Sequence, residues 1–300
     1  MPNIPHTRFS TDREPWRFED SASLTAAFSA RAREPMRRAW ELASHILGGA
    51  PMEVEVLAES FRAIVLRCRT RESSVVAKHF RRRDSATNAS GFGFLRARHG
   101  AEVLPHVARL LAVDEVARML IFEDVGSGDP VTKGPLSFRS WLHSWPTLCR
   151  NADSTLGRAF RNSIAASDPE SARRGTSGAL PSLGLLRRRG IPESEIRRLI
   201  EPERSVLWCG DMNPSNFVRH RERGVLQIDT EGTGYCDPAL LVAEVRGRLP
   251  SALNRDRFLG LLTPQEWDEA ADHLAGHWHV TSRDEEIARR CLDAISHELR

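Results

Sequence analysis

The sequence predicts an α+β protein built from two lobes that share a cleft. Its 300 residues exceed one usual domain and suit such a division. Strand-like apolar runs dominate the first part of the chain, whereas helical spacing dominates most of the second. With 40% hydrophobic and 28% charged residues, the composition is that of an ordinary globular protein.

The first part of the chain contains one clear helix and several strands. Residues 1–32 are polar, with Pro and Arg among a few aromatics, and we expect an N-terminal extension there. Over residues 34–47, apolar side chains recur at helical spacing and stop at a Gly pair, which predicts an amphipathic helix. Strands are expected over 54–57, 63–68, 74–78, 109–113 and 118–124, with one helix within 88–98.

The second part of the chain begins with a Gly- and Pro-rich stretch over 126–140, which we interpret as a connection between lobes. Helices broken by polar loops are expected over 141–205. Asp237 and Pro238 form an N-cap and first-turn pair, which predicts a further helix. Two amphipathic helices are expected near the end of the chain, over 267–274 and 284–299.

Two short polar runs carry the strongest chemical signal. Residues 209–216 contain Asp211 and Asn216, residues 228–231 contain Asp229, and each run ends an apolar strand-like segment. A basic, Gly-containing tip lies between them, so we expect a hairpin, with the three side chains at the same end of neighbouring strands. Phosphoryl transfer from Mg-ATP requires such a set, since one acid accepts the proton of the attacking hydroxyl while an amide and a carboxylate hold the metal. An ordinary polar turn is the alternative interpretation.

A lysine far upstream strengthens the first interpretation. The chain has two lysines, Lys78 and Lys133, among 43 Lys and Arg residues. Lys78 stands inside an apolar strand, where a long cation is normally unfavourable. A compact ammonium on a flexible stem suits the α- and β-phosphates of a nucleotide. The competing interpretation is a strand-end lysine whose head group reaches solvent.

The order of four residues resembles the motif set of the aminoglycoside phosphotransferase and choline kinase-like family, whose members are small-molecule kinases. These residues are Lys78, Asp211, Asn216 and Asp229. Residues 119–126 resemble that family's last N-lobe strand and hinge, and the resemblance extends over about 52–249. It implies a protein-kinase-like bilobal fold, with a small N-lobe containing an antiparallel sheet and a larger, mainly helical C-lobe. The expected divisions are 1–32 (extension), 33–125 (nucleotide-binding N-lobe) and 126–300 (C-lobe).

The resemblance also implies a role for each motif residue. ATP and Mg²⁺ would be the cofactors, and the acceptor would be a hydroxyl of a small molecule. Asp211 would accept the hydroxyl proton, and Asn216 and Asp229 would coordinate the metal. The nucleotide would be bound by Lys78 at the phosphates and by the backbone of Glu123, Asp124 and Val125 at adenine.

Several departures from the family pattern keep a second interpretation open. Cys209 and Asn213 stand where His is common, and residues 85–98 contain no acid to pair with Lys78. A thiol is a weak hydrogen-bond partner. The alternative to an active small-molecule kinase is therefore a catalytically impaired, kinase-like protein that acts as a nucleotide-binding or regulatory partner.

Composition excludes several other classes. Because the formal net charge is only +3, we expect no nucleic-acid partner, and short Arg runs at 81–83 and 187–189 are interpreted as solvated faces. Five scattered cysteines without a C-x2-C pair fit a cytoplasmic protein without zinc. The absence of a long apolar run argues against a membrane partner. Neither the oligomeric state nor the acceptor, whether an antibiotic or a metabolite, can be predicted from the residues.

Overall fold

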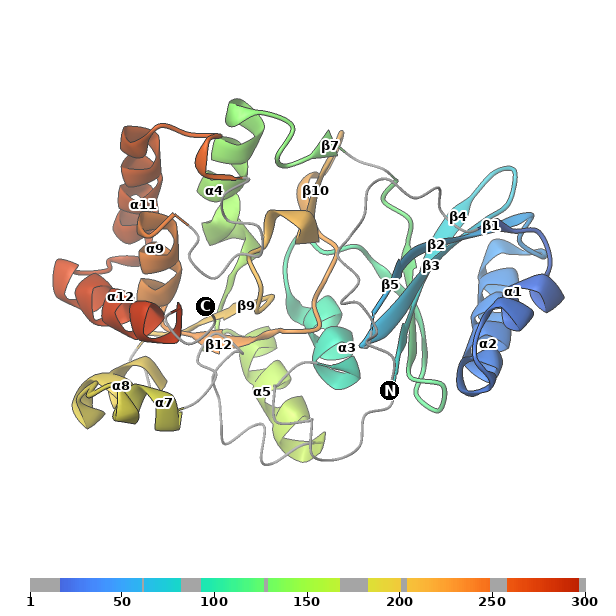
Figure 1. Cartoon of the computed structure of the whole chain (residues 1–300), viewed down its shortest axis with the longest axis horizontal. Helices are drawn as coiled ribbons and strands as arrows, with labels where there is room; N and C mark the ends of the chain where they lie inside the picture. Colours follow the sequence, from blue (N-terminus) through green and yellow to red (C-terminus); the bar gives the residue numbers. More distant parts are fainter. Residues whose placement is uncertain are drawn as a thin grey trace, which may run out of the picture. The chain divides into compact units, whose positions relative to one another are not determined.

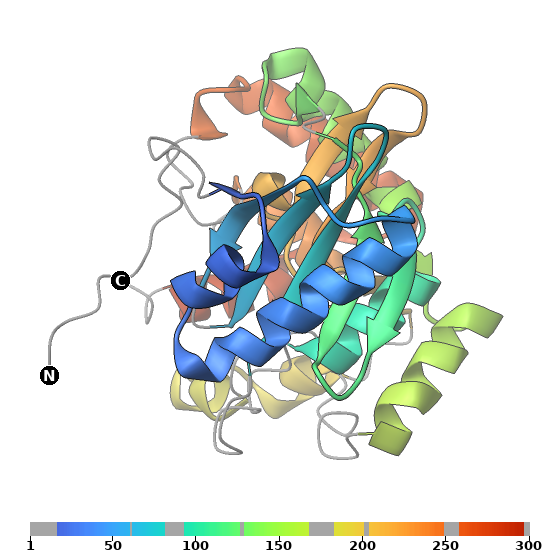
Figure 2. The ribbon, with the colours of Figure 1, turned by 90° about the vertical axis from the view of Figure 1, so that its right-hand side faces the viewer.

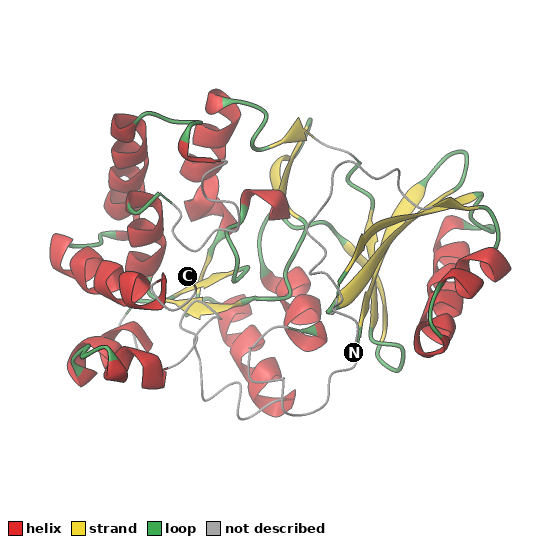
Figure 3. Ribbon diagram, in the orientation of Figure 1, coloured by secondary structure: helices red, strands yellow, loops and turns green. Residues whose placement is uncertain are grey.

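The α+β class is confirmed by the computed structural model, which describes residues 17–60, 62–81, 93–126, 129–167, 183–200, 204–248 and 258–296. The chain divides into two compact units. The described parts of residues 1–88 and 108–126 form the first, and those of 89–107 and 127–300 form the second. The first unit contains an antiparallel sheet, and the second is mainly helical (Figure 3).

A six-stranded antiparallel sheet forms the centre of the first unit (Figure 1). All five strands expected in this part of the chain are present, and a sixth, Arg17–Phe18, pairs with the first of them. The strand order is β1-β2-β3-β4-β6-β5. The bounds are β1 Arg17–Phe18, β2 Glu53–Glu59, β3 Ala63–Arg69, β4 Ser74–Phe80, β5 Leu110–Asp114 and β6 Met119–Glu123.

Two helices, α1 (Ser21–Ala27) and α2 (Ala30–Leu47), cover one face of this sheet (Figure 2). Their buried side chains share one apolar cluster with strand residues that include Ile64 and Ala77. Helix α2 begins before the predicted start and ends, as predicted, at the Gly pair, where Gly48 adopts φ 71°. Residues 17–32, expected to be an extension, therefore contribute a strand, a helix and the first turn of α2.

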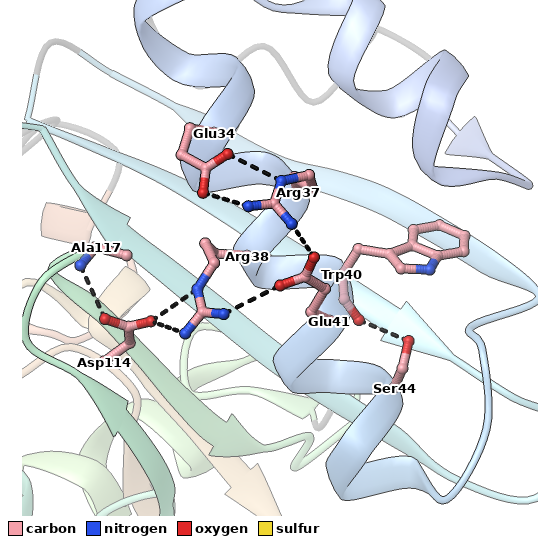
Figure 4. Close-up of polar contacts among 8 residues, drawn as sticks. All are labelled: Glu34, Arg37, Arg38, Trp40, Glu41, Ser44, Asp114 and Ala117. Atoms are coloured by element: carbon pink, nitrogen blue, oxygen red, sulfur yellow. Dashed lines mark hydrogen bonds and ion pairs between the residues drawn. The ribbon is translucent and has the colours of Figure 1, made fainter.

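An ion pair between Arg38 and Asp114 joins α2 to the sheet (Figure 4). Arg38 contacts the Asp114 carboxylate at the end of β5, with a 2.7 Å N–O distance. Asp114 also accepts a hydrogen bond from the Ala117 amide at 2.9 Å. This backbone bond, with the Arg38 guanidinium, holds the pKa of the Asp114 carboxyl below its usual range.

The described core of the second unit contains four buried tryptophans, Trp141, Trp145, Trp208 and Trp267. Helix α9 lies against α11 and α12. As predicted, Asp237 caps α9 by accepting a hydrogen bond from the Ala239 amide at 2.8 Å. The described helices of this unit are α3 Phe94–Val103, α4 Pro135–Leu148, α5 Thr155–Ser167, α7 Leu183–Arg188, α8 Glu193–Ile200, α9 Pro238–Arg246, α11 Pro264–Trp278 and α12 Ser282–Ser296.

Helix α3 begins at Phe94, later than expected, and continues to Val103. Residues 88–92, where the sequence predicted its start, lie outside the described part of the chain, as do residues 1–16 of the expected extension and residues 82–83 of one Arg run. No helix within the described ranges is long and apolar enough to cross a membrane.

Two small antiparallel sheets position the polar runs of the second unit. The hairpin between the runs is confirmed, since β10 pairs with β11. The strand before the first run, β9, belongs to the other sheet, so the prediction that it neighbours this hairpin is wrong. The sheets have the orders β11-β10-β7 and β12-β9-β8, with bounds β7 Asp129–Pro130, β8 Arg150–Asn151, β9 Val206–Trp208, β10 Phe217–His220, β11 Gly224–Gln227 and β12 Gly234–Cys236.

Candidate active site

The open end of the β10–β11 hairpin carries Asn216 on one side and Asp229 on the other. The last pair of the ladder is Phe217 with Gln227. One step further, the Ile228 amide donates a hydrogen bond to the Asn216 carbonyl at 2.9 Å. The hairpin therefore holds the backbone of the two predicted metal-binding positions in fixed register, as the sequence spacing indicated.

A close contact between two glycines joins the Asp211 loop to the turn that follows Asp229. Gly210 has φ +86°, a left-handed conformation that side-chain-bearing residues rarely adopt. A Cβ built on Gly210 would lie 1.8 Å from the Gly232 carbonyl oxygen. Only Gly fits at position 210. The close contact with Gly232 brings Asp211 near Asp229, although β9, the strand before Asp211, lies in a different sheet. The sequence signal was only a Gly directly before the Asp.

Hydrogen bonds within residues 209–216 set the direction of Asp211. Its carboxylate accepts from the Asn213 amide at 3.0 Å, and its carbonyl accepts from the Asn216 side-chain amide at 3.2 Å. The Cys209 thiol also donates to this carbonyl, at 3.3 Å. The loop is thus held partly by the buried thiol of Cys209. Asn213 caps the short 3₁₀ turn Pro214–Asn216.

Asp229 and Glu231 lie close enough to Asp211 to affect its pKa. Asp211 is accessible to solvent. The protein atoms packed around its carboxyl nevertheless raise its pKa, because they disfavour the charged form. The carboxylates of Asp229 and, more weakly, Glu231 raise the pKa of Asp211 further. A site with this concentration of negative charge favours the binding of a cation.

Asn216 and Asp229 supply oxygen donors, the type that Mg²⁺ prefers. The Asn216 side-chain nitrogen donates to the Asp211 carbonyl, which turns the amide oxygen away from that bond. One oxygen of Asp229 accepts the Glu231 amide at 3.1 Å, which orients the carboxylate. No group of three or more His, Cys, Asp or Glu residues with metal-binding geometry occurs in the described ranges. Two protein ligands nevertheless fit Mg²⁺, which usually keeps several waters and also binds substrate phosphates.

Lys78 lies in the first unit, on the central strand β4, opposite Val65 and Leu120 of its neighbours. Ala77 belongs to the cluster under α1 and α2, so the Lys78 side chain lies on the sheet face away from these helices. The residue is only 9% exposed, and its ammonium is 5.2 Å from the centre of the Phe80 ring. This burial disagrees with a lysine that simply extends into solvent.

Residues 123–125, the predicted adenine-binding backbone, follow the end of β6. The Glu123 amide donates to the Arg109 carbonyl at 2.9 Å and is therefore part of the sheet. The buried Asp124 carboxylate pairs with Arg67 at 2.8 Å and accepts from the Ser74 hydroxyl at 2.7 Å. These contacts fix the segment through its side chains. Because the Glu123 amide is already bonded within the sheet, the backbone groups of Asp124 and Val125 are the stronger candidates for adenine recognition.

The second unit also contains an aromatic core, a histidine pair and a cavity. Trp141 and Trp145 are fully buried and form part of that core. His143 stacks on His273 with the ring centres 4.6 Å apart. A cavity of about 380 Å³ also occurs, but neither Asp211, Asn216 nor Asp229 lines it. Its lining residues are Ser194, Arg197, Arg198, Arg204, Asp237, Pro238, Trp278, His279, Val280 and Asp284.

No protein-family model matches the sequence, and no curated protein matches it. Solved structures do show similarity. Choline kinase LicA from Streptococcus pneumoniae is 14% identical with a TM-score of 0.45, and the match covers 86% of this chain and 97% of LicA. Aminoglycoside phosphotransferase APH(3'')-Id from Streptomyces rimosus is 18% identical with a TM-score of 0.43, and covers 78% and 89%.

Macrolide 2'-phosphotransferase MphH from Brachybacterium faecium is 17% identical with a TM-score of 0.39, over 80% of this chain and 92% of that protein. Choline kinase and aminoglycoside phosphotransferases are the proteins that the sequence motifs resemble. At these values the similarity carries no argument about activity, and the roles of individual residues depend on this chain's own geometry.

Proposed function

We infer that this protein is an ATP-dependent phosphotransferase that moves the γ-phosphoryl group to a hydroxyl of a small molecule. The observation that carries this inference is the approach of Asp211 to Asp229, close enough for one carboxylate to raise the pKa of the other. Bringing two acids together is unfavourable in the absence of a cation. A magnesium-dependent site gives this arrangement a use.

Asp211 is proposed as the group that orients the acceptor hydroxyl and takes its proton. The transition state of phosphoryl transfer is loose in most treatments, so placing the nucleophile matters more than strong basicity. The bonds to Asn213 and Asn216 support this role because they fix both ends of the residue. The hydroxyl oxygen forms a bond to the γ-phosphorus while the bond from that phosphorus to the β-γ bridging oxygen of ATP breaks.

Asn216 and Asp229 are proposed to hold Mg²⁺. When bound, the ion would neutralise charge on the phosphates. Lys78 is proposed to contact the α- and β-phosphates, and the backbone over 123–125 to bind adenine. The burial of Lys78 supports its role, because an ammonium held against an apolar sheet face gains from a polyanionic partner.

The alternative is a nucleotide-binding protein that has lost turnover. Its support is the replacement of His by the buried Cys209, together with the absence of an acid from residues 85–98 of the sequence, where the resemblance leads one to expect a Glu. The two functions share the nucleotide site and differ only in whether phosphoryl transfer occurs.

Binding is tested by a thermal-shift titration with Mg-ATP. We expect the parent protein to gain about 2.7 kcal/mol of stability at a ligand concentration of 100 times Kd, and Asp229→Ala to lose most of this gain. Asp293→Ala, which removes an exposed acid from α12, is the matched control and should respond as the parent does. No response of the parent to nucleotide or metal would remove both functions.

Turnover is tested by ATP consumption over a broad panel of hydroxylated small molecules. Once an acceptor has been identified, Asp211→Asn should reduce kcat by at least about 100-fold, which is within the usual contribution of general acid–base catalysis. Nucleotide affinity should stay nearly unchanged. Parental kcat in this variant would remove Asp211 from its role. Binding without any turnover of the parent would favour the alternative.

A further inference from the structure

Helix α3 is bonded directly to the turn that follows Asp229. Arg96 is only 7% exposed, and its guanidinium donates to the Thr233 carbonyl at 2.7 Å. The Thr230 hydroxyl donates to the Ala97 carbonyl at 2.9 Å, and the Gly93 amide at the helix start donates to the Glu231 carbonyl at 3.0 Å. Three hydrogen bonds therefore join the helix and its N-cap to Thr230, Glu231 and Thr233 of the turn.

The packing between helix and turn is as close as the hydrogen bonding. A Cβ built on Gly100 would lie 2.1 Å from the Thr233 hydroxyl oxygen. That hydroxyl donates to the Thr230 carbonyl at 2.7 Å, which closes the turn on itself. The turn consequently has little room to shift toward α3, and the bonds from α3 oppose a shift away from it.

This turn controls the direction of the Asp229 carboxylate. One Asp229 oxygen accepts the Glu231 amide at 3.1 Å, so a change in the backbone at Glu231 would rotate the carboxylate or break this bond. Glu231 is in turn held through its carbonyl by the Gly93 amide. Such contacts hold a metal-binding residue in place without touching the metal. Removing one commonly changes metal affinity or activity by about 10–100-fold.

We propose that Arg96 is a positioning residue that fixes the 229–233 turn and so presets Asp229 for the metal. Helix α3 thus stabilises the turn that follows Asp229 through a buried cation. This inference rests on the proposed function only in taking Mg-ATP as the species that binds at Asp229. The contact between helix and turn stands independently of it.

The first experiment needs no ligand. Hydrogen exchange of the amides over 231–234 is compared among the parent, Arg96→Met, Arg96→Lys and Arg98→Met. Loss of a buried hydrogen bond to a charged donor should speed exchange in Arg96→Met on the order of tenfold. Arg96→Lys, which keeps one donor, should recover part of the protection. Arg98→Met, which removes a more exposed cation that pairs with Glu102 on the same helix, should match the parent.

The second experiment titrates Mg²⁺ at fixed ATP and follows the thermal shift. Arg96→Met should need about 10-fold more Mg²⁺ for half of the shift, whereas the Arg98→Met midpoint stays parental. Thr230→Val, which keeps Arg96 but loses the bond to Ala97, should shift the midpoint in the same direction and serves if Arg96→Met does not fold. A purely structural role would lower the melting temperature without moving the midpoint.

Each outcome separates this inference from the proposed function. Parental exchange and a parental Mg²⁺ midpoint in Arg96→Met would overturn it, as would equal losses in Arg98→Met. If the parent itself shows no response to Mg-ATP, the proposed function fails. The exchange experiment then still decides whether Arg96 fixes the turn.

Discussion

At the scale of single residues, the contact of Gly210 with Gly232 has the strictest steric requirement in the candidate site. Two independent conditions meet at Gly210, a left-handed φ and a carbonyl that leaves no space for a Cβ. Both conditions act on the same loop, which positions Asp211. A substitution there should therefore affect stability and catalysis together.

We expect Gly210→Ala to lower the free energy of unfolding by on the order of 3 kcal/mol, because backbone strain adds to a clash with main-chain atoms. Urea unfolding measures the change. Gly276→Ala is the control, since Gly276 lies in α11 with nothing near its Cβ position, and it should gain about 0.5–1 kcal/mol. An unchanged midpoint in Gly210→Ala would contradict the contact.

The residues that carry chemistry were predictable where the signal was local. The spacing of Asn216 and Asp229 predicted their fixed register, because a hairpin sets register over a short stretch. The approach of Asp211 depends instead on the contact between Gly210 and Gly232. The contact of Arg96 with Thr233 was not predictable, since it joins positions 137 residues apart and depends on how α3 packs. An arginine in an ordinary helical pattern carries no sign of this.

At the scale of elements, helix α9 begins at the N-cap residue Asp237, whose charged form is disfavoured by burial. Burial raises the pKa of Asp237 to about 6, although the capping bond from Ala239 lowers it. A carboxyl with a raised folded-state pKa stabilises the protein most below its unfolded pKa of about 3.9. That contribution is lost as the pH rises through about 6.

Asp237→Asn should therefore show a pH-dependent effect. Asparagine caps helices about as well as aspartate and carries no charge. Relative to the parent, we expect a gain of about 1 kcal/mol at pH 8, discounted from the full shift because Asp237 is only partly buried, and little difference near pH 4.5. Urea unfolding at both pH values gives the comparison. A gain confined to the acid side would reverse the sign and contradict the assigned pKa.

The elements that were predicted correctly have long periodic patterns of apolar residues, or strong capping or turn signals at their ends. Helices α2 and α9 and the β10–β11 hairpin belong to this group. The two-residue strands β1, β7 and β8 were missed because they exist only through pairing with distant strands. Helix α1 was missed because its seven residues contribute one buried side chain, Leu24, too few for a periodic signal.

At the scale of the whole molecule, the two lysines divide between the two units and differ in environment. Lys78 is buried in the sheet of the first unit, whereas Lys133 of the second is exposed and pairs with Asp129 at 2.7 Å. The Asp129 pair lies at the surface, where such contacts contribute about 0–1 kcal/mol. Only the buried lysine is proposed to bind nucleotide.

Lys78→Met should weaken Mg-ATP binding at least about tenfold, because the loss of a charged bond to phosphate costs roughly 1.5–3 kcal/mol. Lys133→Met is the matched control and should keep parental affinity. Isothermal titration measures both. Equal affinities for the two variants would remove Lys78 from the nucleotide site while leaving the roles proposed for the second unit in place.

The same lysine distribution has a practical consequence for labelling. Apart from the amino terminus, Lys133 is the one primary amine that amine-reactive dyes can reach easily, since Lys78 is 9% exposed and all other basic side chains are Arg or His. A fluorophore attached there at alkaline pH would report from a single side chain beside β7. The protein could thus carry a site-selective probe without any engineered cysteine.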